Sequence, residues 1–502
     1  MRPPQVIVRT VARSGSVPTP IFYEKTMLSL FIFGYLALTL LIGWFASRRV
    51  KSSADFVVAG RKLPLFLATT ALFATWLGSE TVMGATAEFA EHGLIGVIED
   101  PFGAALCLFL CGILIARPLY KRNLLTFSDF FRQRFSRSAE VVSAVFMAPS
   151  YFSWIAAQLV ALSILLHIVS GVPREWGVAT CAGLVLFYTY IGGMWAVSVT
   201  DFVQTIAIIV GLAALAIDLA MQVGGLTELA AAAPEGYFRF LPEASAKDVM
   251  LWLAAWMTIG LGSIPQQDVF QRVMASRDEK TAVRACYVSS LMYLSIAALP
   301  LLISYCGRIL YPELLEEDAQ MLLPNMVLRH SGLGMQILFF GALLSAILST
   351  CSGAMLAPAT VIGENLLKPL FRDLSDAQML QLLRWSVVLV AIVTSAMAMM
   401  RSNIYELVGE SSALSLVSLF VPLMAGLYWK QANATGAIAS MIAGMGTWAI
   451  CLIWLPAEPA ESAGFFWHVP AMLYGLAASI AAMWAGAMYE SHAKRREKLP
   501  FS

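Results

Sequence analysis

The sequence predicts an all-α protein that crosses a membrane many times. Of its 502 residues, 59% are hydrophobic and only 13% are charged, whereas an ordinary soluble domain has roughly 25% charged residues. Apolar runs of about 18 residues or more recur along the chain, and each is long enough to cross a hydrocarbon core about 30 Å thick. We therefore expect a helical bundle without a separate soluble domain. The net charge of +1 gives no indication of a nucleic-acid partner.

The apolar periodicity predicts about 13 transmembrane helices. They are expected at 27–48, 65–90, 98–118, 140–168, 174–192, 199–222, 248–270, 283–306, 333–364, 379–400, 403–428, 432–455 and 467–489. Lys and Arg gather in alternate connections, such as 48–62 and 117–137, whereas Glu prevails in others, such as 313–318. Because cytoplasmic loops carry the excess of basic residues, we expect the N-terminus outside and the C-terminus inside.

The polar chemistry of the spans argues against an enzyme. The seven cysteines lie in or at the ends of apolar spans without a Cys-x-x-Cys pair, and the five histidines are scattered. These patterns fit neither a metal enzyme nor a disulfide framework. An intramembrane hydrolase would also need a nucleophile paired with a base, and the sequence offers no such pair.

One membrane-length segment, 71–85, is not expected to remain a regular helix. Thr75, Gly78 and Ser79 are weak helix formers, and Glu80 is ionisable. Because lipid offers no hydrogen-bond partners, a broken helix at bilayer depth must be buried in protein or line a watery cavity. A second stretch, 260–268, repeats the Leu-Gly-Ser triplet and contains Pro265. Paired interruptions of this kind are typical of a transporter's substrate site.

A cluster of small hydroxyl residues occupies 345–353. Ser349 lies on one helical face with Ser345 and with Ser352, so several oxygens point the same way. Hydroxyl and carbonyl oxygens suit a hard cation such as sodium. Small residues also allow membrane helices to approach closely, so both interpretations stay open at this point.

Two acidic positions allow two interpretations each. Asp201 is either a first-turn residue that complements the helix dipole behind Thr200, or an acid at the inner end of an ion path. Glu99 precedes Asp100 and Pro101. It is either one of the acidic residues that ordinarily precede a proline at a helix start, or a substrate ligand.

Three tryptophans are candidate walls of a binding site. Trp76 stands at the break itself, where its ring face is placed to meet a cationic group. Trp154 and Trp256 lie deep within their spans and either pack against neighbours or add further walls.

Four segments together resemble the sodium:solute symporter family. They are Gly192-Gly193 through Thr200-Asp201 to Gln204, Ile264-Pro-Gln-Gln-Asp-Val-Phe-Gln-Arg272, Ala346-Ile-Leu-Ser-Thr350 and Trp429-Lys-Gln-Ala-Asn-Ala-Thr-Gly-Ala437. The resemblance implies a leucine-transporter-type fold, in which two inverted repeats of five helices follow one extra helix.

On this resemblance the chain divides into six parts. They are a tail at 1–26, an extra helix at 27–48, a first repeat at 65–222, a second repeat at 248–428, two C-terminal helices at 432–489 and a cytoplasmic tail at 490–502. Met27 is an alternative start of the chain.

The resemblance also implies a sodium site. Members of that family bind sodium through backbone carbonyls at the positions of Ala74, Leu77 and Ala346 and through hydroxyls at the positions of Ser349 and Thr350. Some members hold a second sodium with an aspartate and hydroxyls, which gives Asp201 and Ser352 a possible role in a second site or in coupling. The next position in this chain is Gly353, which has no hydroxyl, so the sequence leaves open whether one or two sodium ions bind.

The substrate is less sharply indicated. Thr75-Trp76 and Thr86-Ala-Glu88 resemble the choline-carrying branch, but Gln266 departs from the Trp of that branch, and Glu99 matches a glutamate of a sugar carrier. The expected substrate residues are Trp76, Gly78, Ser79, Thr81, Glu99, Trp154, Trp256 and Gln266.

We therefore expect sodium-coupled symport of a small polar organic solute by alternating access, with a choline-like cation as one candidate. The alternatives are a proton-coupled carrier, a carrier of sugars, amino acids or carboxylates with the same fold, and a solute sensor. Na⁺, the solute and the bilayer are the expected partners, with no nucleic acid and no obligatory protein partner. The expected location is the cell membrane, as a multi-pass protein of a bacterial inner membrane.

Overall fold

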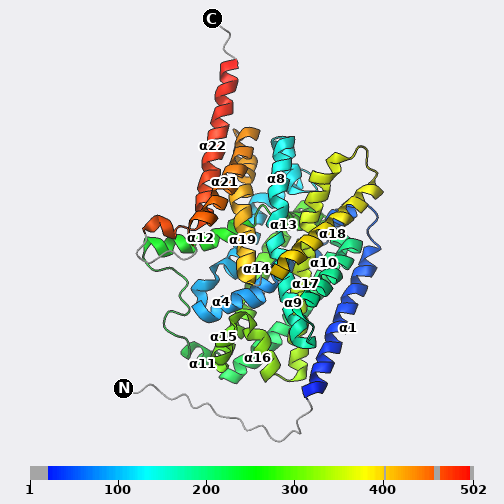
Figure 1. Cartoon of the computed structure of the whole chain (residues 1–502), viewed down its shortest axis with the longest axis vertical. Helices are drawn as coiled ribbons and strands as arrows, with labels where there is room; N and C mark the ends of the chain where they lie inside the picture. The colour runs from blue at the N-terminus through cyan, green and yellow to red at the C-terminus, as the bar shows by residue number, and fades with distance from the viewer. Residues whose placement is uncertain (1–20, 401–402, 457–463, 498–502) are drawn as a thin grey trace.

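The computed structural model describes residues 21–400, 403–456 and 464–497, and most of them are helical (Figure 1). The tail expected at 1–26 therefore lies largely outside the described residues, as does the end of the tail at 490–502. Within the described part of the chain, extended pairing is limited to one isolated bridge between Leu63 and Ser276. The prediction of an all-α polytopic protein is confirmed.

The first half of the chain contains fifteen helical elements, where η denotes a 3₁₀ or π helix. They are α1 (Ile21–Ser47), α2 (Ser53–Val58), η1 (Ala59–Arg61), α3 (Leu65–Trp76), η2 (Glu80–Gly84), α4 (Ala85–His92), η3 (Gly93–Val97), η4 (Ile98–Gly103), α5 (Ala104–Leu110), η5 (Cys111–Ile115), α6 (Ala116–Tyr120), α7 (Phe127–Arg134), α8 (Arg137–Ser150), α9 (Phe152–Ser170) and α10 (Arg174–Val223).

The remaining elements extend to the C-terminal helix. They are α11 (Leu226–Ala231), α12 (Ala246–Gly262), α13 (Gln267–Ala275), α14 (Glu279–Leu310), α15 (Glu313–Glu317), η6 (Ala319–Met321), α16 (Leu322–His330), α17 (Leu333–Val361), η7 (Ile362–Leu367), η8 (Lys368–Leu370), α18 (Asp376–Met400), α19 (Ile404–Ser415), η9 (Leu416–Phe420), α20 (Val421–Tyr428), α21 (Ala434–Trp454), η10 (Phe465–His468) and α22 (Ala471–Glu497).

Ten helical spans in the described residues are long and apolar enough to cross a membrane, or eleven when the bent pair of α12 and α13 is counted. The predicted number of about 13 is larger partly because α10 is one span of 50 residues. A straight helix of that length would measure about 75 Å, more than twice the hydrocarbon thickness. The backbone of Gly193 leaves the helical conformation (φ 46°, ψ −144°), so α10 contains both predicted segments 174–192 and 199–222. The count of 13 stays a prediction.

Short polar motifs set where several helices begin. The Thr126 hydroxyl accepts a hydrogen bond from the Asp129 amide, and the Asp129 side chain accepts one from the Thr126 amide. Asp278 and Asn433 cap α14 and α21 in the same manner, through the amides of Thr281 and Gly436. These side chains satisfy amides that a helix start leaves without a partner.

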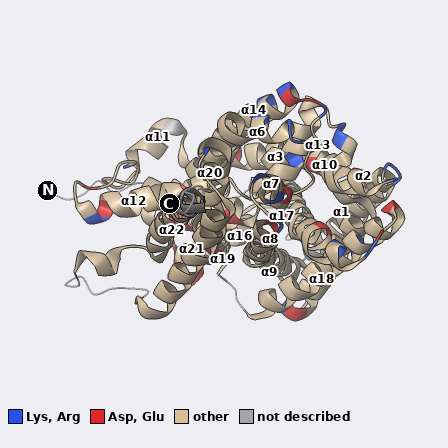
Figure 2. Cartoon of the chain, turned by 90° about the horizontal axis from the view of Figure 1, so that it is seen from above, with Lys and Arg blue, Asp and Glu red and all other residues tan. Residues whose placement is uncertain are grey.

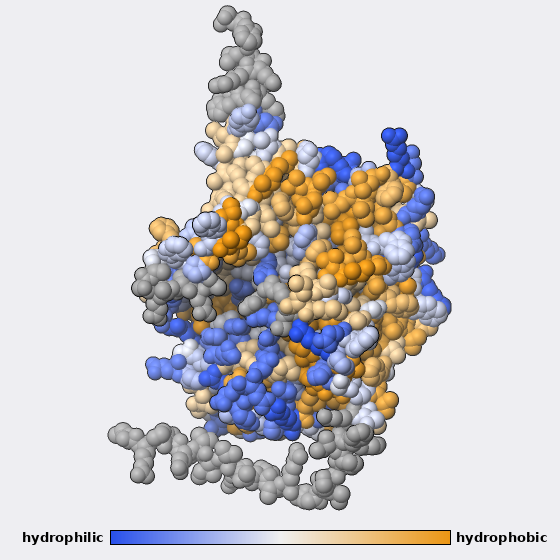
Figure 3. Space-filling view, in the orientation of Figure 1, coloured by the Kyte–Doolittle hydropathy of each residue, from blue (hydrophilic) through white to orange (hydrophobic). Residues whose placement is uncertain are grey.

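The bundle is built around α10 and α17, which pack along each other, with α1 on the outer side of α10 and α3 against α14. Helices α21 and α22 form a separate antiparallel pair at one flank (Figure 1). Hydrophobic side chains cover much of the flank, and hydrophilic ones gather at the end near α11, α15 and α16 (Figure 3). This distribution is that of a protein embedded in a bilayer.

The connections that carry basic residues lie together at one end of the bundle. The Arg277 amide donates to the Leu63 carbonyl at 2.9 Å, and the Tyr120 hydroxyl donates to the Ser276 carbonyl at 2.9 Å. Figure 2, viewed from the end at which α22 finishes, shows Lys and Arg around α2, α6 and α13. The start of α1 lies at the other end (Figure 1). This arrangement supports the predicted threading, and which end faces the cytoplasm stays a prediction.

Cysteine labelling tests the threading. Glu316 and Arg372 are both exposed and lie on connections predicted to be external and cytoplasmic, respectively. In intact cells, a membrane-impermeant maleimide is expected to label Glu316→Cys and to label Arg372→Cys only after the membrane is opened. The wild-type protein, whose cysteines are all buried or half-buried, is the background control. The reverse labelling pattern would show that the orientation is wrong.

Candidate functional site

Helix α3, which follows the short elements α2 and η1, is interrupted where the sequence predicted a break. Helix α3 ends at Trp76, Leu77 is non-helical (φ −84°, ψ 77°), and the chain resumes helical turns in η2 at Glu80. The second predicted break lies between α12 and α13, whose axes differ by 46°. Each break leaves backbone groups that need partners inside the bundle.

Helix α17 lies directly against the first break. The Thr350 hydroxyl donates a hydrogen bond to the Ala74 carbonyl at 3.0 Å. Ala74, Leu77, Ala346, Ser349 and Thr350 are all buried. The structure therefore brings the two elements of the expected sodium site into contact, through the Ala74 carbonyl of α3 and the Thr350 hydroxyl of α17.

The two residues expected at a second ion position are also buried beside this cluster. The Ser349 hydroxyl donates to Oδ1 of Asp201 at 2.5 Å, which joins α17 to α10. The Ser352 hydroxyl donates to the Ser349 carbonyl of its own helix at 2.9 Å. Asp201 is thus hydrogen-bonded to the hydroxyl cluster, whereas the Ser352 hydroxyl donates its hydrogen bond within α17.

The residues after the break are held from α9. The Ser79 amide donates to Oε1 of Gln158 at 2.9 Å, and Nε2 of Gln158 donates to Oε2 of Glu80 at 2.7 Å. The other Glu80 oxygen, Oε1, accepts a hydrogen bond from Nε1 of Trp154 at 3.0 Å. Glu80 is therefore a buried carboxylate fixed at the break by two side chains of one neighbouring helix.

Glycine is required at the centre of the break. A Cβ on Gly78 would lie 2.6 Å from Oε2 of Glu80, 2.8 Å from Oε1 of Gln158 and 2.8 Å from Oγ1 of Thr350. Three polar side chains from three elements converge on this backbone, so no larger residue fits without displacing one of them.

Aromatic rings form one wall next to the break. The rings of Trp76 and Trp154 lie 6.0 Å apart between centroids, and Tyr151 lies 6.0 Å from Trp154. The indole nitrogen of Trp76 and the hydroxyl of Ser79 are buried without a hydrogen-bond partner. These unpaired donors are available to a bound solute.

A tyrosine on α14 links the break to a second buried carboxylate. The Tyr293 hydroxyl donates to Oδ1 of Asp100 at 2.5 Å and lies 2.7 Å from Oγ1 of Thr81 and 3.1 Å from the Trp76 carbonyl. Oδ2 of Asp100 has no partner. Asp100, Tyr293 and Gln158 were not among the predicted site residues, although Asp100 is an intramembrane acid next to the candidate Glu99.

Three predicted substrate residues make their contacts elsewhere. Trp256 belongs to an aromatic cluster with Phe102, Phe240 and Trp252. Glu99 lies toward α19, near Gly409. Gln266 is buried at the start of α13, and its backbone N–H donates a hydrogen bond to the Ser263 carbonyl.

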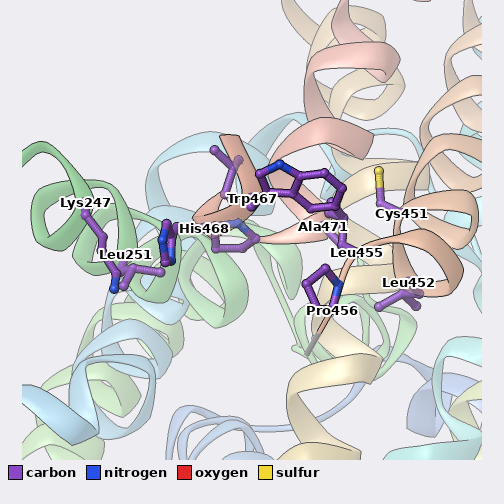
Figure 4. Close-up of a pocket in the computed structure, with 11 residues that line it drawn as sticks. Lys247, Leu251, Cys451, Leu452, Leu455, Pro456, Trp467, His468 and Ala471 are labelled. Atoms are coloured by element: carbon purple, nitrogen blue, oxygen red, sulfur yellow. The ribbon is translucent and has the colours of Figure 1, made fainter. Parts of the chain in front are cut away.

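A cavity of about 620 Å³ lies apart from the break (Figure 4). Helices α12, α21 and α22 and the short η10 surround it, with Lys247, Trp467 and His468 among its lining residues. None of the predicted site residues lines this cavity.

Comparison with known proteins identifies the family of this chain. The profile of the sodium:solute symporter family matches residues 56–444, which is most of the chain. The chain belongs to the sodium:solute symporter family. It is therefore a sodium-coupled symporter of a small solute and a multi-pass membrane transporter, not an enzyme.

Several curated proteins of this family resemble the symporter over most of its length. The human high affinity choline transporter 1 is 26% identical over 444 residues, which cover 84% of this chain and 76% of that protein. The osmoregulated proline transporter OpuE of Bacillus subtilis is 28% identical over 466 residues, which cover 89% of this chain and 92% of that protein.

Solved structures confirm the fold. A substrate-bound outward-open Na⁺-coupled sialic acid symporter superposes with a TM-score of 0.77 at 19% identity and covers 93% of this chain and 98% of its own. MhsT in complex with L-phenylalanine superposes with a TM-score of 0.52 at 14% identity, over 85% of this chain and 99% of its own. The predicted leucine-transporter-type fold is correct.

Removing the Tyr293 hydroxyl is expected to destabilise the symporter. Tyr293→Phe leaves a buried oxygen of Asp100 without its donor, and such a loss costs about 1–3 kcal/mol of unfolding free energy. The thermal unfolding temperature of the purified protein in detergent is expected to fall. Tyr287→Phe, at a half-exposed ring on the same helix, is the matched control. Equal unfolding temperatures for both variants would contradict the assignment of the Tyr293 network.

Proposed function

We propose that the symporter carries a small organic cation, of the choline type, together with Na⁺ by alternating access. The observation that carries this proposal is the pair of buried carboxylates at the break, Glu80 and Asp100. Glu80 accepts a hydrogen bond from the Trp154 indole, and the Tyr293 hydroxyl joins Asp100 to the Trp76 carbonyl. Among the described residues, neither carboxylate forms an ion pair with Lys or Arg. Buried carboxylates without a basic partner favour a positively charged ligand.

The aromatic wall supports the same class of solute. A quaternary or protonated ammonium group is attracted to the face of an indole ring. The indoles of Trp76 and Trp154 lie side by side, and that of Trp154 donates to Glu80. The relatives include high affinity choline transporters, and choline is a quaternary ammonium. The proline-carrying relatives make a zwitterionic amino acid the second candidate.

We propose that the first sodium ion binds between α3 and α17. Carbonyls of Ala74, Leu77 and Ala346 and hydroxyls of Ser349 and Thr350 would supply its oxygen ligands, a set that suits a hard monovalent cation. The hydrogen bond from Thr350 to the Ala74 carbonyl supports this placement, because it already joins the two ligand-bearing elements.

Sodium then acts as a cross-link that shapes the solute site. Its binding would hold α3 against α17, which sets the positions of Trp76, Gly78, Ser79 and Thr81. The solute, once seated against Trp154, would permit closure on the outer side. We assign Glu99, Trp256 and Gln266 to the approach to this site. Glu99 lies near α19, Trp256 packs in the aromatic cluster with Phe102, Phe240 and Trp252, and Gln266 lies at the start of α13.

The repeats at 65–222 and 248–428 form part of the proposal. Their first helices are the two interrupted ones, and this correspondence supports an inverted repeat with the site at the repeat interface. Alternating access would move one repeat element against the other around the fixed site. A cell membrane, with a sodium gradient and a potential across it, is the setting that this function requires.

The driving force of one sodium ion is sufficient for accumulation. Moving one charge through 100 mV yields about 2.3 kcal/mol, and a tenfold sodium gradient adds about 1.4 kcal/mol. A cationic solute carries a second charge inward and gains the same electrical term. Uptake is therefore expected to be electrogenic.

Transport by purified protein in liposomes tests the proposal. With an inward Na⁺ gradient, radiolabelled choline is expected to accumulate, whereas a K⁺ gradient of equal size produces no accumulation. Proline and glucose serve as the zwitterionic and neutral comparison solutes. Accumulation of proline or glucose but not of choline would reject the cation assignment, and equal uptake in Na⁺ and K⁺ for every solute would contradict the sodium coupling.

The sodium ligands are tested by removing their hydroxyls. Ser349→Ala with Thr350→Ala is expected to raise the Na⁺ concentration for half-maximal uptake at least about tenfold, since a lost polar interaction with a charged group costs about 1.5–3 kcal/mol and each 1.4 kcal/mol is tenfold. Thr394→Ala is the matched control, because Thr394 is a buried threonine on α18 that bonds only its own helix backbone. An unchanged half-maximal concentration in the double variant would remove both residues from the site.

A further inference from the structure

Arg272 places a fully buried positive charge next to the hydroxyl cluster. Its Nε donates to the Ala71 carbonyl at 2.9 Å, and Nη1 donates to the Asp268 carbonyl at 3.2 Å. Nη2 lies 3.9 Å from Oδ2 of Asp201, and both side chains are fully buried. Neither Nη2 nor this Asp201 oxygen has a hydrogen-bond partner. Because an isolated charge is costly in a protein interior, each group depends on the other.

Gly353 creates the space that the guanidinium occupies. A Cβ at this position would lie 2.0 Å from Nη2 and 3.0 Å from Cζ of Arg272. Any side chain at 353, including a serine that could offer an oxygen to an ion, would collide with the guanidinium. The arginine head therefore lies against α17, one helical turn after Ser349.

The two oxygens of Asp201 are divided between a hydroxyl and a cation. Oδ1 accepts a hydrogen bond from the Ser349 hydroxyl, and Oδ2 faces the Arg272 guanidinium. The Ser352 hydroxyl is directed to the Ser349 carbonyl. A sodium ion added at this carboxylate would face the guanidinium at close range in a medium of low dielectric constant, where like charges repel strongly.

We propose that Arg272 is a built-in cation that takes the place of a second sodium ion at Asp201, so that the symporter binds one Na⁺ per cycle. The inference rests on the proposed sodium site at Ala74, Leu77, Ala346, Ser349 and Thr350. It changes the role expected for Asp201 and Ser352 from sodium ligands to positioning residues. Through its bond to Ser349, the Asp201–Arg272 pair holds one ligand of the first sodium in place.

Counting bound sodium tests the inference without knowledge of the solute. Equilibrium binding of ²²Na⁺ to the purified full-length protein is expected to give about one ion per chain. Arg272→Gln removes the charge and retains an amide donor, which leaves the Asp201 carboxylate without a cation. This variant is expected to bind about two sodium ions per chain. Arg272→Lys keeps a positive charge and is expected to bind about one.

The matched control removes both charges. Arg272→Gln combined with Asp201→Asn leaves a neutral pair, and the number of bound ions is expected to return to about one. A merely structural role of Arg272 would not make the ion count follow the net charge of this pair. Monodisperse gel filtration of each variant establishes that it is folded.

Two results would overturn the inference. They are two sodium ions bound to the wild-type protein, and one ion bound to a folded Arg272→Gln variant. Since the wild-type count alone distinguishes one ion from two, the test holds even where a variant does not fold. No sodium bound to the wild-type protein would instead contradict the proposed first sodium site.

Discussion

The structure depends on how the broken backbone at Leu77 to Ser79 is satisfied inside the membrane. Regular helix ends at Trp76, and lipid cannot supply partners to the amides and carbonyls that this leaves. The bundle supplies them from other helices. Gln158 of α9 accepts from the Ser79 amide, Thr350 of α17 donates to the Ala74 carbonyl, and Tyr293 of α14 lies 3.1 Å from the Trp76 carbonyl.

These same partners create the chemistry of the site. A helix break that is satisfied by hydroxyls, an amide and a tyrosine has oxygen atoms facing one another across α3, α9, α14 and α17. Oxygen-rich surroundings of this kind suit a sodium ion. Tight convergence of the helices explains why position 78 must be glycine, because a Cβ there would meet Glu80, Gln158 and Thr350. The structural constraint and the proposed sodium site thus have one origin.

The buried acids near the break differ in whether they have a basic partner. Glu80 and Asp100 lie near the break without a basic partner among the described residues, whereas Asp201 faces Arg272. The acids therefore divide into two groups. Asp201 has a basic partner in the chain and offers no site to a solute in our proposal, whereas Glu80 and Asp100 are proposed to attract a cationic solute held against Trp76.

Local features of the sequence predicted part of this site. The break follows from Gly78 and Ser79 within an apolar span, and the hydroxyl cluster follows from the spacing of Ser349 and Thr350. Gln158, Tyr293 and the pairing of Arg272 with Asp201 were not predicted, because contacts between residues far apart in the chain leave no periodic pattern in either segment. Likewise, Trp256 was a candidate wall or a packing residue because it lies deep within its span, and the structure places it in an aromatic cluster with Phe240 and Trp252.

Hydrogen exchange of the symporter in Na⁺ and in K⁺, at equal ionic strength and without solute, tests the central claim most directly. If sodium cross-links the break to α17, amides of segments 71–85 and 343–353 will exchange more slowly in Na⁺, and those of α21 (Ala434–Trp454) will be unchanged. Identical exchange of 71–85 in both salts would contradict the account.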